Sequence, residues 1–150
     1  MGARLEVRSL CKSFGSLSVL NNWNLNIRES ERIVLLGPSG SGKTTLLDMI
    51  PGRISTDSGE IDIGQTVHIG YYDQESRALN DEQRVIDYIR DVAEYVTTNE
   101  GIQITAGKML ERFLFEPAAQ YAVIGNLSGG ERRRLYLLRI LMGSPNVLLL

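Results

Sequence analysis

The chain has 150 residues, of which 43% are hydrophobic and 23% charged, so it is long enough to form one domain around a sizeable core. Its net charge of −2 gives no support to nucleic-acid binding by bulk electrostatics. No apolar run is long enough to span a bilayer, and the N-terminus lacks the apolar segment of a secretory signal. A single cysteine, Cys11, excludes a disulfide framework. These features predict a reduced, cytoplasmic protein.

The first part of the chain is predicted to be an antiparallel β part. Leu5–Leu10 alternates apolar and polar residues, as a half-buried strand does. Val19–Leu20 and Trp23–Ile27 repeat this pattern, and Asn21–Asn22 is the expected turn between them. The apolar run Arg32–Leu36 then predicts a buried strand.

The most informative stretch is Gly37–Thr45, which fits G-x-x-x-x-G-K-[ST] at every fixed position. It lies between a predicted strand and a predicted helix over Thr45–Ile50, which Pro51 should end. Glycines let the loop backbone approach phosphate oxygens, and the start of a helix adds partial positive charge. The motif therefore predicts that Lys43 reaches the β- and γ-phosphates of a nucleotide and that Thr44 binds Mg²⁺.

Two strands and then two helices are expected after this loop. The strands are Glu60–Ile63 and Val67–Tyr72, and His68 within the second is expected at a solvated or edge position. Val85–Val96 places its apolar residues on one helical face. Thr105–Phe115 is the second amphipathic helix.

The clearest helical pattern is Glu131–Met142. Ser128, followed three residues later by a glutamate, forms a capping-box pattern at its start. The basic run Arg132–Arg134 is interpreted as a solvated face of this helix. Val147–Leu150 then begins an apolar, buried strand.

The phosphate-binding loop, followed later by Leu127-Ser-Gly-Gly-Glu131, resembles the ATP-binding-cassette (ABC) ATPases over essentially the whole chain. The resemblance implies an α/β P-loop NTPase fold with an N-terminal antiparallel β part and a helical insert. It divides this partial nucleotide-binding domain into a β part and P-loop core (1–74), a helical insert (75–126), and the signature helix with the start of the Walker B strand (127–150).

The resemblance also bears on catalysis. The family's Walker B Asp and Glu and its switch histidine would lie beyond Leu150, so the cassette is expected to be incomplete on its C-terminal side. Residues 1–150 are therefore expected to hold no catalytic residue, and to be inactive in hydrolysis by themselves.

The family's site residues carry over to matching positions of this chain. Phe14 would stack on adenine with Val19 as a further contact, and Gln74 would sense the γ-phosphate and, with Thr44, hold Mg²⁺. The implied ATP-binding residues are Phe14, Val19, Gly37, Pro38, Ser39, Gly40, Ser41, Gly42, Lys43, Thr44 and Thr45. The implied signature residues, which would bind in trans the γ-phosphate held by another cassette, are Leu127, Ser128, Gly129, Gly130 and Glu131.

Within the family, the chain is most similar to the second cassette of an ABC-F protein. The stretches Ile69–Gln74, Met109–Phe115 and Leu127–Tyr136 carry this similarity. It implies ATP and Mg²⁺ as cofactors, a second cassette packed head to tail and the ribosome as candidate partners, and no insertion into a membrane. Two alternatives stay open: the nucleotide-binding subunit of an ABC membrane transporter, and a nucleotide-binding module that does not hydrolyse ATP.

Overall fold

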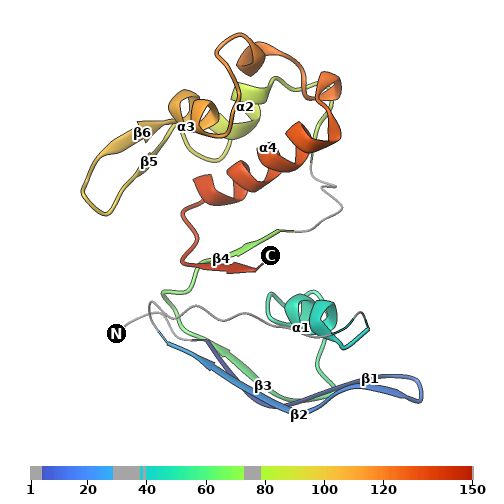
Figure 1. Ribbon diagram of the computed structural model, residues 1–150. Coiled ribbons are helices and arrows are strands. Elements are labelled where there is room, and N and C mark those ends of the chain that lie inside the picture. The colour runs from blue at the N-terminus through green and yellow to red at the C-terminus, as the bar shows by residue number, and fades with distance from the viewer. Residues whose placement is uncertain (1–4, 29–37, 39, 73–78, 150) are drawn as a thin grey trace. The chain divides into compact units, whose positions relative to one another are not determined.

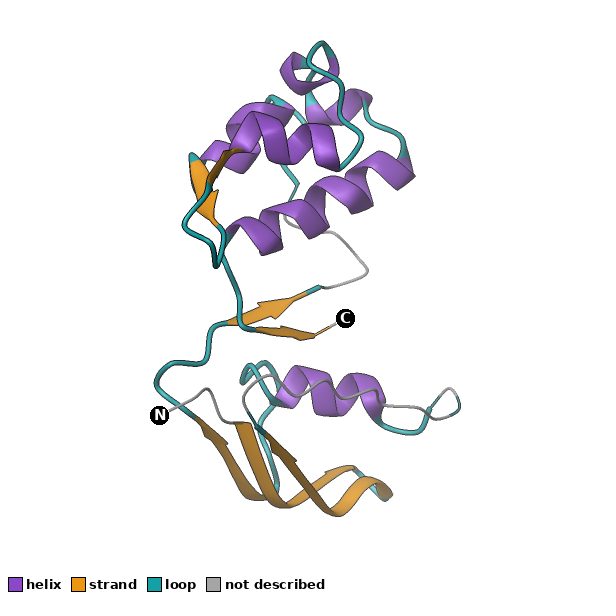
Figure 2. Ribbon diagram, turned by 60° about the vertical axis from the view of Figure 1, so that its left-hand side comes forward, coloured by secondary structure: helices purple, strands orange, loops and turns teal. Residues whose placement is uncertain are grey.

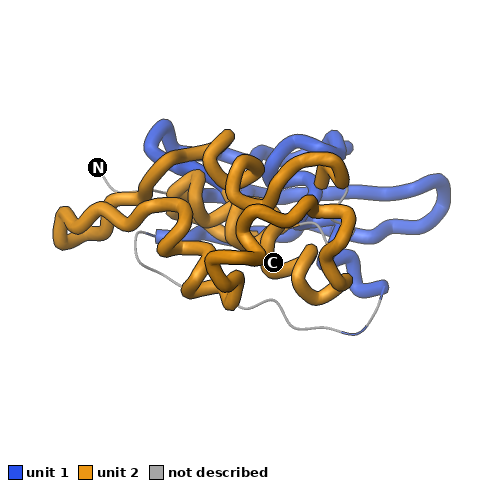
Figure 3. Tube along the Cα trace, turned by 90° about the horizontal axis from the view of Figure 1, so that it is seen from above, with its two compact units in different colours: residues 1–69 blue, residues 70–150 orange. Residues whose placement is uncertain are grey.

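The computed structural model describes residues 5–28, 38, 40–72 and 79–149. The chain divides into two compact units, Met1–Ile69 and Gly70–Leu150, which Figure 3 colours separately. The division expected from the resemblance, into 1–74, 75–126 and 127–150, stays a prediction.

The first unit contains a three-stranded antiparallel sheet in the order β2-β1-β3 (Figure 1). Its central strand, β1 (Leu5–Phe14), pairs with β2 (Leu17–Ile27) on one side and with β3 (Ser58–Ile63) on the other. Leu5 and Val7 of β1 are buried as the sequence pattern predicted, but the alternation is interrupted before Leu10, where Ser9 has a φ of 48°. The sheet confirms the expected antiparallel β part.

The predicted turn at Asn21–Asn22 is wrong, because both residues lie inside β2. The chain reverses instead at Gly15, whose φ of 59° suits a tight turn. Asn22 has a φ of 48° and lies near an irregular step in the β1–β2 register, between Leu10 and Lys12. Asparagine tolerates a positive φ, so it can occupy a bulge within a strand as well as a turn.

The helix of the first unit, α1 (Lys43–Met49), buries Leu46 and Met49. It ends as predicted: Ile50 is its C-cap, and the N–H of Gly52 donates to Met49 O at 3.0 Å. The predicted strand at 32–36 lies outside the described residues.

The second unit contains a short two-stranded pairing and a group of helices. Strand β4 (Ile69–Tyr71) pairs with β7 (Val147–Leu149), and the N–H of Tyr72 donates to Leu149 O at 2.8 Å. Both strands were predicted, although β4 is shorter than expected and the exposed His68 precedes it.

The other helices of this unit lie on one side of α4, the longest helix in Figure 1 and in Figure 2. Their bounds, with those of two 3₁₀ turns, are α2 (Val85–Arg90), α3 (Ala106–Arg112), η1 (Ala119–Tyr121), η2 (Ile124–Asn126) and α4 (Gly129–Met142). One hydrophobic core connects them, and it consists of Val85, Ile86, Tyr88, Ile89, Ala106, Leu110, Phe115, Ile124, Leu135, Leu138 and Met142. Helix α4 therefore packs on this core through its middle and last turns, at Leu135, Leu138 and Met142.

The predicted helix at Val85–Val96 is wrong in its second half. Helix α2 ends at Arg90, and β5 (Tyr95–Thr97) pairs antiparallel with β6 (Gln103–Thr105). A valine spaced for a helical face is also a good strand residue, and cross-strand pairing decides between the two. The next predicted helix is confirmed, although α3 is shorter than the expected 105–115.

Candidate functional site

The phosphate-binding loop leads directly into α1. Lys43 is the first residue of α1, and its Nζ donates to Pro38 O at 2.9 Å and to Ser41 Oγ at 3.2 Å. The ammonium therefore points back along the loop, which is where the motif places phosphate oxygens. Gly37 and Ser39 lie outside the described residues.

Two glycines of the loop have backbone conformations that other residues rarely adopt. Gly40 and Gly42 have φ values of 82° and 85°. A Cβ on Gly42 would lie 2.7 Å from Cγ1 and 3.1 Å from O of Val19. The loop therefore packs directly against β2 at Val19, a residue that the resemblance assigns to the adenine end of the site.

The start of α1 has no side-chain cap. Gly42 is its N-cap and offers no side-chain hydrogen bond, so the first N–H groups of the helix lack the usual capping oxygen. Thr44 is exposed and Thr45 half-buried in this first turn. A hydroxyl and the N–H groups of a helix start suit a phosphate and a hard cation bound to it.

The adenine-stacking candidate, Phe14, ends β1 and is 50% exposed. Beside it is a contact that sequence reasoning missed. The ammonium of Lys12 lies over the ring, 5.3 Å from its centroid, and donates to Asp57 Oδ1 at 2.8 Å. The second oxygen of Asp57 accepts the N–H of Ser13 at 2.7 Å. These hydrogen bonds, the one from Lys12 first, lower the pKa of Asp57.

The signature residues Ser128, Gly129 and Gly130 are exposed at the start of α4. The predicted capping box is confirmed. Ser128 N and Oγ donate to Glu131 Oε2 at 2.8 and 2.6 Å, and Glu131 N donates to Ser128 Oγ at 3.3 Å. The hydroxyl and then the N–H of Ser128 lower the pKa of Glu131. Leu127 is half-buried and packs against the core.

A second set of contacts holds the turn before the signature. The guanidinium of Arg132 donates to the carboxylate of Asp81 and, at 3.2 Å, to Ile124 O, which also accepts the N–H of Leu127 at 3.0 Å. Gly125 N donates to Asp81 O at 2.9 Å, and a Cβ on Gly125 would lie 3.1 Å from that oxygen. Asp81 thus bonds to the turn at Gly125 through its backbone oxygen and to the first turns of α4, at Arg132, through its carboxylate.

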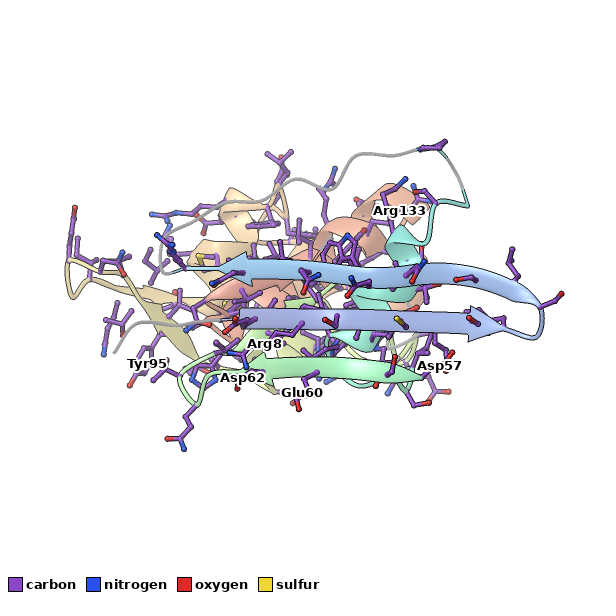
Figure 4. All side chains as sticks on the ribbon, turned by 90° about the horizontal axis from the view of Figure 1, so that it is seen from below. Arg8, Asp57, Glu60, Asp62, Tyr95 and Arg133 are labelled. Carbon is purple, nitrogen blue, oxygen red and sulfur yellow. The ribbon has the colours of Figure 1, made fainter. Side chains whose placement is uncertain are left out.

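The prediction that Arg132–Arg134 forms a solvated face is wrong for two of its members. Arg132 is paired as described above, and the guanidinium of Arg134 lies 5.8 Å from the ring centroid of Phe115. Only Arg133, labelled in Figure 4, is exposed. A helix with a 3.6-residue period turns consecutive residues in different directions, so three adjacent arginines cannot share one face.

The described ATP-binding candidates therefore belong to 1–69 and the signature to 70–150. Gln74 lies outside the described residues. Among the residues that the structure describes, no group of three or more His, Cys, Asp or Glu side chains could hold a metal ion. None of the helices in the described ranges is long and apolar enough to cross a membrane.

Comparison with known proteins gives a family match over residues 20–150, to the model described as ABC transporter. An uncharacterized ABC transporter ATP-binding protein, YfmR of Bacillus subtilis, is 49% identical over 146 residues. The ATP-binding protein Uup and the energy-dependent translational throttle protein EttA, both of Escherichia coli K12, are each 32% identical. Each alignment covers 97% of this chain, but only 23%, 23% and 26% of the respective relatives. The chain thus spans about a quarter of the length of these curated relatives.

Proposed function

Because the chain belongs to the ABC transporter family of ATP-binding domains, we propose that it binds ATP through Gly37–Thr45, as part of an ABC-F cassette. The observation that carries this proposal is the loop itself. A complete motif leads into a helix whose start has no side-chain cap, with the ammonium of Lys43 turned toward the loop.

The remaining contacts to the nucleotide follow from the family's motif. Phe14 stacks on adenine, with Val19 beside it, and the exposed ring and the Val19–Gly42 contact support this assignment. Thr44 supplies a hydroxyl to Mg²⁺, and Gln74 senses the γ-phosphate and contributes a second contact to the cation.

We assign the signature residues to a different nucleotide, the one bound by a second cassette packed head to tail. Ser128, Gly129 and Gly130 are exposed at the start of α4, and the N–H groups of a helix start suit a γ-phosphate. The Ser128 hydroxyl donates to Glu131 Oε2, so it would have to leave that oxygen in order to donate to the phosphate. Closure of the pair around ATP would give the intact protein its ATPase activity. The Asp that orients Mg²⁺ and the Glu that activates water would follow β7 in the family's order.

The intact protein is proposed to act in the cytoplasm, with the ribosome as its partner. The support is the similarity to EttA, whose name describes an energy-dependent translational throttle. A membrane transporter subunit would instead have a membrane-embedded partner. Sedimentation of the intact protein with ribosomes, in a non-hydrolysable ATP analogue and in ADP, separates the two. Co-sedimentation that requires the triphosphate supports the ribosomal role, and none in either nucleotide contradicts it.

Nucleotide binding is tested by calorimetric titration of the intact protein with ATP. Lys43→Ala removes the cation at the β- and γ-phosphates and should weaken binding about a hundredfold, as expected when one partner of a close charge pair is truncated. The matched control is Lys108→Ala, since Lys108 pairs with Glu111 on the surface of α3. Equal affinities of the Lys43→Ala variant and the unmodified protein would show that ATP does not bind at this loop.

A further inference from the structure

Lys12 is an unusual residue of the first unit because its charge is buried. Its side chain is 11% exposed, whereas the side chain of Arg8, on the same strand, is 55% exposed. Burying an ammonium costs free energy unless a partner compensates, and Asp57 is that partner. The two contacts of this ammonium, with Asp57 and with the ring of Phe14, show what the buried charge holds together.

Asp57 holds three consecutive residues of β1. Its N–H donates to Cys11 O at 3.1 Å, and its two carboxylate oxygens take the ammonium of Lys12 and the N–H of Ser13. Figure 4 shows Asp57 at the end of the sheet where β3 begins. The β1–β2 register shifts on both sides of Lys12, and bulges of this kind redirect side chains near binding sites.

Next to these register shifts, the side chain of Lys12 contacts the ring of Phe14. The ammonium of Lys12 lies over the ring at 5.3 Å from its centroid, while half of Phe14 remains exposed. A cation over an aromatic face is an attractive contact that fixes the orientation of the ring. We propose that Lys12, oriented by Asp57, is a positioning residue that holds the Phe14 ring ready to stack on the adenine base. This inference rests on the proposed function, in which Phe14 is the stacking residue.

The test compares two ligands of the intact protein, ATP and inorganic tripolyphosphate, by calorimetry. Both engage the phosphate-binding loop, but only ATP has a base to stack. Phe14→Ala should weaken ATP binding about tenfold, within the range of base–aromatic stacking. Lys12→Met keeps an unbranched side chain that lacks only the terminal ammonium, and should weaken ATP binding about two- to fivefold. Neither variant should change the affinity for tripolyphosphate.

Two further variants support the assignment. Lys12→Arg retains a cation that can pair with Asp57 and lie over the ring, so it should bind ATP as the unmodified protein does. The matched control, Arg8→Met, removes an exposed charge from the same strand and should change neither affinity. In the double variant Lys12→Met/Phe14→Ala, ATP affinity should equal that of Phe14→Ala, because Lys12 acts through the ring.

The contrary outcomes are distinct. If Lys12→Met weakens both ligands equally, or adds fully to Phe14→Ala, Lys12 has a structural role and the inference is wrong. If Phe14→Ala weakens ATP binding and Lys12→Met does not, the inference alone fails. If Phe14→Ala has no effect, the stacking assignment fails first. Should Lys12→Met unfold, Asp57→Asn applies the same criteria, because it releases the ammonium and keeps the shape of its partner.

Discussion

The two units hold their candidate sites in different ways. The signature in the second unit starts a fourteen-residue helix that packs on a continuous hydrophobic core, and a capping box fixes its first turn. In the first unit, the phosphate-binding loop leads into a seven-residue helix without a side-chain cap, and Phe14 ends a strand. Polar contacts of Lys12 and Lys43 orient this region.

The difference indicates which of the two candidate sites a ligand completes. The hydrogen bonds of Lys43 go to oxygens of its own loop, and phosphate oxygens are stronger acceptors that can replace them. The signature turn already has its hydrogen bonds and packing before any nucleotide arrives. We therefore expect substitutions that disturb packing or capping to affect the signature residues most. Substitutions that remove a charge should affect the phosphate-binding loop most.

The largest expected effect is on the core of the second unit. Phe115 is 1% exposed, so Phe115→Ala should lower the free energy of unfolding by about 3–5 kcal/mol. The control is its neighbour Leu114, which is 72% exposed and whose change to Ala should cost less than about 0.5 kcal/mol. Urea denaturation measures both. Similar losses of unfolding free energy in the two variants would mean that core packing does not stabilise the unit that carries the signature.

Next in size is Ser128→Arg, which places bulk and charge at the exposed start of α4. ATP hydrolysis by the paired cassettes should fall about a hundredfold, comparable to losing one hydrogen-bond donor to a transition state. ATP binding to a lone cassette should persist. Loss of binding in that monomer would argue that the signature acts on its own nucleotide.

Loss of the hydrogen bonds from Arg132 to Asp81 and Ile124 should have a smaller effect. Arg132→Ala leaves Ile124 O with the N–H of Leu127, but frees the Asp81 carboxylate, so hydrolysis should fall about three- to tenfold, as expected for a coupling residue outside the site. Arg133→Ala, on the exposed side of the same helix turn, should not change the rate. Equal hydrolysis rates in the two variants would show that Arg132 does not position the signature residues.

The smallest effect concerns pH. The folded-state pKa of Glu131 is lowered by Ser128, so its stabilising contribution is present above the ordinary glutamate pKa and is lost as pH falls through the lowered value. Melting temperatures of the unmodified protein and Glu131→Gln should therefore converge only below about pH 4. A difference that stays constant from neutral to acidic pH would show that the charge of Glu131 is not what caps α4.

Strong local signals made the best sequence predictions. The capping residue Ser128 and the apolar period after it gave the correct helix, and Pro51 correctly marked the end of α1. The hairpin of β5 and β6 was missed because Val96 fits a helical face as well as a strand, and its pairing with Ile104 is not visible in local periodicity. Lys12 and Arg132 were missed because their partners, Asp57 and Asp81, are distant in sequence.

The contact between Gly42 and Val19 limits which substitutions related chains can accept at these two positions. No side chain fits at position 42 while Val19 occupies its present place, and a larger residue at 19 would press on the loop. A smaller residue at 19 would give room for a Cβ at position 42 but would not relieve the strain of its φ of 85°, so position 42 should stay glycine as related chains diverge. A related chain with a larger residue at 19 would have to shift its phosphate-binding loop. That shift would change the distance between the sites for the base and for the phosphates of its nucleotide.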